Sequence, residues 1–413
     1  MITTGIQPYE NTDEIRTGAQ HWIFFFMALL SNIWGGIVST LMAVYLPVVV
    51  KDLLGSPSNH LNQVSAFINS LFLAGWTVGG ISWGIISDRM GRVRSFILSF
   101  AAYGLFTLIT GFVTTWELVV TLRLLAGFCV GGVLVISNIY LSEIWPAKTR
   151  GIFIGFLSIG FPVGIFSAGL TNLIFPGWRT GFMIGVIPLG LALLSALLLK
   201  GYKFRPETSA GERVELQKLF THHQRDLVSG SVIFGSMLIG MWAVFSWLPT
   251  WIQSILQHSD GQKERGLSMM LMGVGGLTGG FISGWVSRGL GLKKTLLLCF
   301  AGCLVTAEIL FGFNREFSDI IYAEIGVLAV FFGISQGVLS IYIPQLFSHS
   351  FRGAATGFCY NTGRLFTAAA VFFVGALVSL FNGYSHTLVV FSVIFLFGLI
   401  TIYFSRDLKL KTN

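Results

Sequence analysis

Arg364 lies in the middle of an apolar segment, residues 351–381, that is long enough to cross a membrane. A central arginine raises the free energy of inserting such a segment by roughly 2.5–3.5 kcal/mol. The chain can keep it there only if the guanidinium faces protein, water or an anionic group. Because the planar fork of an arginine can pair with both oxygens of a carboxylate, Arg364 predicts a binding site for an organic anion.

Other polar and aromatic side chains lie in the neighbouring apolar segments. Asn361 and Tyr360 precede Arg364 by three and four residues, which predicts that all three share one face of a helix. Arg123 lies about 9 Å from the outer end of its segment, at 1.5 Å per residue. The predicted substrate-binding residues are Arg364, Asn361, Tyr360, Asn32, Trp242, Gln336 and Arg123.

Glu324 is the predicted proton-coupling residue, because a carboxylic acid buried at this depth in a membrane could carry a proton. Glu308 lies at a similar depth in the preceding segment. Two alternatives stay open for Glu324. Its carboxylate could be hydrated near the outer end of the segment, or it could form a salt bridge with Arg364 between two parts of the fold. Such a salt bridge could coexist with a binding role for the arginine.

Membrane-spanning helices must position these residues. Of the 413 residues, 54% are hydrophobic and only 11% are charged, against about 25% charged residues in soluble domains. The apolar runs are about twenty residues long, which is the length that crosses a hydrocarbon core of about 30 Å. The sequence predicts an all-α polytopic membrane protein with twelve transmembrane helices, near residues 22–50, 64–86, 95–115, 117–141, 151–175, 180–200, 230–256, 267–287, 294–313, 319–347, 352–380 and 385–405.

The placement of the charges argues against a nucleic-acid partner, despite the net charge of +8. With both termini in the cytoplasm, 19 Lys and Arg residues fall on the cytoplasmic side and five on the other, as the positive-inside rule requires. We expect an integral protein of the plasma membrane, which is the inner membrane in a bacterium. The four cysteines all lie within predicted helices, so no disulfide framework is expected. No cofactor and no metal site are expected.

A charged motif joins the second and third predicted helices. It reads Gly79-Gly-Ile-Ser-Trp-Gly-Ile-Ile-Ser-Asp88-Arg89-Met-Gly91-Arg92-Val-Arg94. Its spacing resembles the G-x-L-x-D-R-x-G-R-K/R signature of the major facilitator superfamily; it departs from the signature at the third position, while Asp88, Arg89, Gly91 and Arg92 align. The resemblance implies the twelve-helix fold of that superfamily.

The end of the fourth predicted helix carries a second motif. The run Glu143-Ile-Trp-Pro146-Ala-Lys-Thr-Arg150-Gly151 resembles the sugar-porter and metabolite–proton symporter branches of the superfamily. Glu143 could pair with a neighbouring arginine in one conformation and release it in another; a simple helix stop at Pro146 is the alternative. The predicted cytoplasmic gate comprises Asp88, Arg89, Arg92, Glu143 and Arg150.

The two halves of the sequence repeat one pattern. A shift of 200 residues aligns Gly79, Gly80, Gly84, Ser87 and Gly91 with Gly279, Gly280, Gly284, Ser287 and Gly291. We expect a six-helix half with a short cytoplasmic tail at residues 1–200, a cytoplasmic linker loop at 201–229, and a second six-helix half at 230–413. In transporters built from such repeats the substrate binds near the midplane between the halves.

The run Gly357-Phe-Cys-Tyr-Asn-Thr-Gly-Arg364 resembles the sialic-acid and lactate–proton symporters of the superfamily. The sequence therefore predicts a monomeric secondary transporter that moves a small carboxylate by alternating access, with proton-coupled symport. A symporter or uniporter for a sugar, a polyol or another neutral metabolite is the alternative if Arg364 is structural. A drug–proton antiporter is less favoured, because its helix-5 motif is not intact. No catalytic constellation lies in the spans, so an enzyme is not expected.

Overall fold

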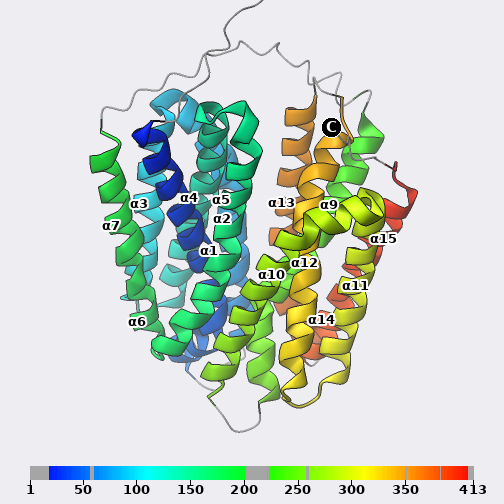
Figure 1. Cartoon of the computed structure of the whole chain (residues 1–413). Helices are drawn as coiled ribbons and strands as arrows, with labels where there is room; N and C mark the ends of the chain where they lie inside the picture. Colours follow the sequence, from blue (N-terminus) through cyan, green and yellow to red (C-terminus); the bar gives the residue numbers. More distant parts are fainter. Residues whose placement is uncertain are drawn as a thin grey trace, which may run out of the picture.

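The computed structural model describes residues 18–55, 60–200, 221, 223–256, 260–348, 351–381 and 383–407. The regular elements within these ranges are helices, and twelve helical segments among them are long and apolar enough to span a membrane (Figure 1). The prediction of an all-α, twelve-helix membrane protein is therefore confirmed.

The helices form two consecutive sets of six spans. The first set comprises α1 (Ala19–Leu54), α2 (Leu61–Met90), α3 (Arg92–Thr110), α4 (Trp116–Ile144), α5 (Ala147–Ile174), α6 (Trp178–Phe182), η1 (Met183–Gly185) and α7 (Val186–Leu198). The second set comprises α9 (Gln224–Ile255), α10 (Gln262–Leu290), α11 (Leu292–Phe313), α12 (Ile320–Gln345), α13 (Arg352–Leu380), α14 (Tyr384–Ser392) and α15 (Ile394–Phe404). The segments Trp178–Leu198 and Tyr384–Phe404 each make one span from shorter pieces.

The two sets stand side by side in Figure 1 and repeat the same close helix packing. In the first set α2 packs along α4, and a Cβ atom on Gly79 would lie 1.9 Å from the carbonyl oxygen of Phe128. In the second set α10 packs along α12, and a Cβ atom on Gly279 would lie 2.1 Å from the carbonyl oxygen of Val330. Glycine at both positions lets the two backbones touch, as is common between membrane helices.

The turns that follow these helices are also equivalent. Gly91 links α2 to α3 with φ of 92°, and Gly291 links α10 to α11 with φ of 83°. Both values lie in the left-handed region, which glycine adopts without steric cost. Gly79 and Gly279 thus occupy equivalent positions in the two sets, and so do Gly91 and Gly291.

Two helix pairs form the most extensive contacts between the sets, and α1 also contacts α9. The first pair is α5 with α10, and the second is α2 with α13. At Gly169 of α5, a Cβ atom would lie 2.4 Å from the carbonyl oxygen of Gly266 of α10. The two sets therefore meet backbone to backbone along α5 and α10, and the space that remains between them is where a substrate could be held.

The predicted linker, residues 201–229, falls largely outside the described residues, as does most of the predicted N-terminal tail. Helix α9 already begins at Gln224, before the predicted start at residue 230. Its first turns contain Gln, Arg, Asp and Ser, so apolar content does not mark where the helix begins. The division of the chain into domains stays a prediction.

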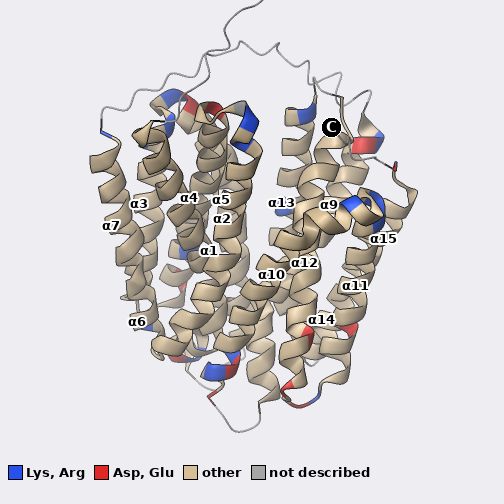
Figure 2. Ribbon diagram, viewed as in Figure 1, with Lys and Arg blue, Asp and Glu red and all other residues tan. Residues whose placement is uncertain are grey.

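The two ends of the bundle differ in charge. We call one of them the basic end; it is uppermost in Figure 2, and there α2 leads into α3 and α10 leads into α11. The helix ends at the basic end carry Arg89, Arg92, Arg94, Lys148, Arg150, Lys200, Arg225, Arg288, Lys293, Lys294 and Arg352. The opposite end carries Lys51, Arg179, Lys263, Arg265 and Arg315.

Candidate substrate site

A cavity of about 610 Å³ lies between the two sets of helices. Its walls come from α2, α4 and α5 on one side and from α9, α10, α12 and α13 on the other. This volume is typical of sites for small molecules, which are mostly apolar and contain a few placed polar groups.

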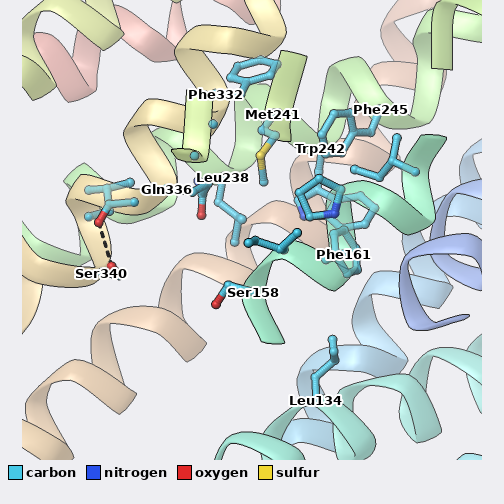
Figure 3. A pocket seen from close by; sticks show the side chains of 18 of the residues that line it. Leu134, Ser158, Phe161, Leu238, Met241, Trp242, Phe245, Phe332, Gln336 and Ser340 are labelled. Carbon is cyan, nitrogen blue, oxygen red and sulfur yellow. Dashed lines mark hydrogen bonds between the residues drawn. The ribbon is translucent and has the colours of Figure 1, made fainter. Parts of the chain in front are cut away.

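Aromatic rings from both sets form much of the wall. The Trp76 ring of α2 meets the Trp242 ring of α9 edge to face, with centroids 5.3 Å apart. The Phe161 ring of α5 lies 5.6 Å from Trp76. Figure 3 shows Phe161, Trp242 and Phe245 gathered on one side of the cavity. Because these rings belong to different halves, a ligand among them would contact both halves at once.

Arg364 of α13 is the one charged side chain among the described residues that line this cavity. No hydrogen bond or ion pair joins its guanidinium to another described residue. The ring of Tyr360, one turn earlier, also lines the cavity and stacks on Phe234 with centroids 4.2 Å apart. A Cβ atom on Gly80 of α2 would lie 4.0 Å from Nη1 of Arg364. The guanidinium therefore reaches from the second set of helices to the first.

Glu324 does not pair with Arg364 in this structure. One of its carboxylate oxygens accepts a 2.6 Å hydrogen bond from the Nδ2 amide of Asn314, and Glu324 is not among the cavity-lining residues. Glu308 is also engaged elsewhere, since the hydroxyl of Ser392 donates to it at 2.6 Å. The salt bridge left open by the sequence is therefore not formed here, and the cavity arginine is without a counter-ion among the described residues.

Arg123 lies outside the cavity. Its Nη1 donates to the carbonyl oxygen of Val38 at 2.8 Å, and its guanidinium covers the ring of Phe72 at 3.9 Å. The side chain is buried, with 2% of the residue exposed. Arg123 thus ties α4 to α1, and in this conformation it is not placed to bind a ligand in the cavity.

Asn32 and Asn361 also lie outside the cavity. The Asn32 amide donates to the carbonyl oxygen of Ala28 at 2.8 Å, and the Asn361 amide donates to that of Gly357 at 2.9 Å. Both amides therefore bond back onto their own helices. At 3.6 residues per turn, each residue of a helix is rotated by about 100° from the one before it. Viewed down the axis of α13, Asn361 and Tyr360 therefore lie on opposite sides of Arg364, and only the Tyr360 side faces the cavity.

Trp242 and Gln336 do line the cavity, together with Tyr360 and Arg364. The structure thus brings four of the seven predicted binding residues together. It adds aromatic residues that the sequence prediction missed, among them Trp76, Phe161 and Phe332. Nothing in their spacing marks them, because aromatic side chains also lie on exposed helix faces away from the cavity, as at Phe373 and Phe397.

The predicted gate residues gather at the basic end of the first set. Arg92 forms two hydrogen bonds to the Glu143 carboxylate, at 2.8 and 3.3 Å, and contacts Asp88 at 2.7 Å. Arg150 instead donates to the carbonyl oxygen of Trp145 at 3.1 and 3.2 Å, and Arg89 is exposed. These contacts lie within one half of the molecule, and their function as a gate stays a prediction.

Hydrogen bonds between the two sets close the opposite end. Nε of Arg265 donates to the carbonyl oxygen of Val44 at 3.1 Å, and the Gln262 amide donates to that of Asn172 at 2.6 Å. The cavity-lining residues come from the middle and basic-end parts of their helices, as Ser340 of α12 illustrates. The cavity is therefore open toward the basic end and closed at the opposite end.

Comparison with known proteins places this geometry in a family. The pattern of the Major Facilitator Superfamily matches residues 22–359. The cis,cis-muconate transport protein of Acinetobacter baylyi is 26% identical over 394 residues, which cover 90% of this chain and 91% of that protein. A probable 4-methylmuconolactone transporter of Cupriavidus pinatubonensis is 28% identical over 73% of this chain and 72% of its own.

A solved structure shares the fold. A bacterial homologue of the human lysosomal transporter Spinster, in an inward-facing and unoccupied conformation, superposes with a TM-score of 0.78. The superposition covers 94% of this chain and 97% of that chain at 14% identity. At this identity the likeness shows the fold alone.

Proposed function

The chain belongs to the Major Facilitator Superfamily, and we propose that it carries a small organic carboxylate across the membrane by alternating access. The named relatives support this proposal, since their substrates are muconate and a muconolactone. These two relatives do not test the resemblance to sialic-acid and lactate symporters. The side chains that line the cavity therefore have to indicate the class of substrate.

The observation that carries the proposal is the single unpaired guanidinium of Arg364 in a mostly apolar cavity. A charge that has left water is stabilised only by a partner of opposite sign or by hydrogen bonds. With no carboxylate beside it among the described residues, Arg364 is complementary to an anion that enters the cavity. Its fork would hold both oxygens of a carboxylate, while Trp76, Trp242 and Phe161 would pack on an unsaturated or aromatic body.

We assign the basic end to the cytoplasm by the positive-inside rule, which puts both termini in the cytoplasm. In a bacterium the membrane would be the inner membrane. The conformation described here is then open to the cytoplasm and closed to the outside. Coupling to a proton, through Glu324 or through protonation of the substrate itself, is part of the proposal, as is a monomeric carrier.

Reconstituted uptake tests the proposal. In liposomes, the wild-type chain should show saturable uptake of benzoate or muconate, and neutral benzamide should not compete. Arg364→Ala removes a charge-assisted bidentate contact, so binding should weaken by about ten- to a hundredfold. Leu365→Ala, the matched control, changes the next residue, which is 61% exposed and faces away from the cavity. Unchanged carboxylate uptake in Arg364→Ala would remove Arg364 from the binding site, and no carboxylate uptake by the wild-type chain would favour a carrier of neutral solutes instead.

A further inference from the structure

One polar group of the cavity is left over when a single carboxylate is bound at Arg364. That group is the side-chain amide of Gln336 on α12, whose Nε2 atom is buried and makes no hydrogen bond to a described residue. A buried amide without a partner costs free energy, which a bound ligand could recover.

Gln336 differs in this respect from the serine, threonine and asparagine side chains around the cavity. The hydroxyls and the Asn138 amide each donate to a carbonyl oxygen of their own helix, at 2.7–3.2 Å. These groups are Thr77, Asn138, Ser158, Ser283, Ser340 and Thr367. Their donors are therefore already used, whereas the donors of Gln336 are free for a ligand.

Two serines lie beside Gln336 and extend it into a polar patch. Ser340 follows it by one turn on α12 and lines the cavity. Ser283 of α10 approaches the same face, because a Cβ atom on Gly337 would lie 2.3 Å from the Ser283 hydroxyl oxygen. We call Ser283, Gln336 and Ser340 the α10–α12 polar patch. Each serine hydroxyl has donated its hydrogen, so its oxygen can still accept one.

The polar patch and Arg364 lie at different parts of the cavity. Nη1 of Arg364 comes close to Gly80 of α2, which packs on Val135 of α4. Figure 3 shows Leu134, the residue before Val135, far across the view from Gln336 and Ser340. The rings of Trp242 and Phe332 and the side chain of Leu238 lie along the cavity wall as well. The cavity therefore has a cationic pole, an apolar middle and an uncharged polar pole.

We propose that the α10–α12 polar patch is a second subsite, which binds a second hydrogen-bonding group of a substrate whose carboxylate is held by Arg364. The ligands it fits are bifunctional acids: a planar or unsaturated body with a carboxylate at one end and a hydroxyl, carbonyl or second carboxylate at the other. Because the Gln336 amide has both a donor and an acceptor end, it can serve each of these groups. This inference rests on the proposed function.

A site built to hydrogen-bond a substrate group discriminates strongly against an analogue that lacks it, because the buried group is then left unpaired. The purified wild-type chain should therefore bind at least one of 3-hydroxybenzoate, 4-hydroxybenzoate and 3-carboxybenzoate about tenfold or more tightly than benzoate. Ligand-induced thermal shifts or competition for uptake measure this ratio.

Gln336→Leu should lower the ratio to about one, because the variant no longer supplies the hydrogen bond that distinguishes the bifunctional acids from benzoate. Gln345→Leu is the matched control, since it makes the same change nine residues further along α12 at a residue that does not line the cavity. It should leave the ratio unchanged. Should Gln336→Leu fail to fold, Gln336→Glu should selectively weaken binding of the dicarboxylate through repulsion.

Two results separate the failure of this inference from the failure of the proposed function. If benzoate binds through Arg364 but all four acids bind equally, or if Gln336→Leu keeps the ratio, the second subsite is wrong and the carboxylate carrier stands. If no acid binds, or if Arg364→Ala leaves binding of all four acids unchanged, the carboxylate site itself is wrong and the second subsite falls with it.

Discussion

Nε of Arg265 in α10 donates a hydrogen bond to the carbonyl oxygen of Val44 in α1 at 3.1 Å, which links the two halves of the molecule at the end opposite the basic end. Nη1 of Arg265 donates to the side-chain oxygen of Gln253. It also donates to the carbonyl oxygen of Asp260, at 2.6 Å. Arg265 is only 2% exposed. Opening this end requires the Val44 bond to break, so the bond stabilises the conformation that is open to the basic end.

Arg265→Ala should therefore shift the conformational equilibrium toward opening at the opposite end. A hydrogen bond from a charged donor contributes roughly 1.5–3 kcal/mol, which corresponds to a shift of about ten- to a hundredfold. Spin labels on cysteines introduced at Lys51 and Lys263, both exposed at this end, should report a population at longer distance. The four native cysteines are buried and should not be labelled.

Arg179→Ala is the control for this experiment. Arg179 pairs with Asp52 at the same end, but both residues belong to the first half. Its loss should leave the distance distribution as in the wild type. An unchanged distribution in Arg265→Ala would show that the Val44 bond does not hold this end closed.

Gly80 gives a second way to disturb the carboxylate site without altering Arg364. A Cβ atom at this position would lie 3.6 Å from Val135 and 4.0 Å from Nη1 of Arg364, both ordinary contact distances. Gly80→Ala should therefore bind carboxylates like the wild type. Gly80→Leu extends toward the guanidinium and should weaken binding by about tenfold or more, as measured by ligand-induced thermal shift.

Gly84→Leu is the matched control, because no other atom lies within 4 Å of a Cβ built there, one turn further along α2. Equal binding by the Gly80→Leu and Gly84→Leu variants would argue that Arg364 binds its anion away from α2. The alternative would then be that the anion binds against the cavity wall formed by the second set of helices.

The sequence predicted the scaffold better than the site, for a physical reason. Long apolar runs and repeated glycines are local signals, and they located the twelve helices and the close packing at Gly79 and Gly279. Arg123 and Arg364 are equally costly charges in apolar segments, so the sequence predicted a binding role for both. Backbone carbonyls of α1 accept hydrogen bonds from Arg123, and carbonyl acceptors have no sequence signature.

Because backbone acceptors have no sequence signature, the sequence also did not reveal the hydrogen-bond partners of two asparagines. Asn32 and Asn361 were predicted to bind substrate because polar groups inside a membrane need partners. Each finds its partner four residues earlier on its own helix. Gln336 has one more methylene group and no such bond, which the sequence alone could not distinguish.

The ion pair of Arg92 with Glu143 should contribute to stability. The two side chains are mostly buried, at 17% and 20% exposed, and they join α3 to α4. Arg92→Met leaves the carboxylate without its bidentate partner, so the free energy of unfolding should fall by roughly 1–3 kcal/mol. Chemical unfolding in detergent measures the change. Because Asp88 is 64% exposed, Asp88→Asn should have a much smaller effect.

The double variant Arg92→Met with Glu143→Leu separates pairing from packing. Removing both charges leaves no unpaired group, so the double variant should be more stable than the sum of the single changes predicts. Strict additivity would show that the two side chains do not interact energetically, despite their contact distance.

Proton coupling through Glu324 is the last prediction. The carboxylate lies outside the cavity and accepts a 2.6 Å hydrogen bond from the Asn314 amide. This hydrogen bond links the start of α12 to the end of α11, and we propose that protonation of Glu324 couples to transport by changing this contact. Glu324→Gln should then abolish the stimulation of uptake by an inward pH gradient and spare counterflow, which needs no net proton movement.

Glu308→Gln is the matched control, because Glu308 is also a part-buried acid that accepts a hydrogen bond from an uncharged side chain, that of Ser392. Uptake by Glu308→Gln should respond to the pH gradient as the wild type does. A full response in Glu324→Gln would remove this residue from the mechanism. The proton would then have to enter on the substrate carboxylate, because no acid among the described residues lines the cavity.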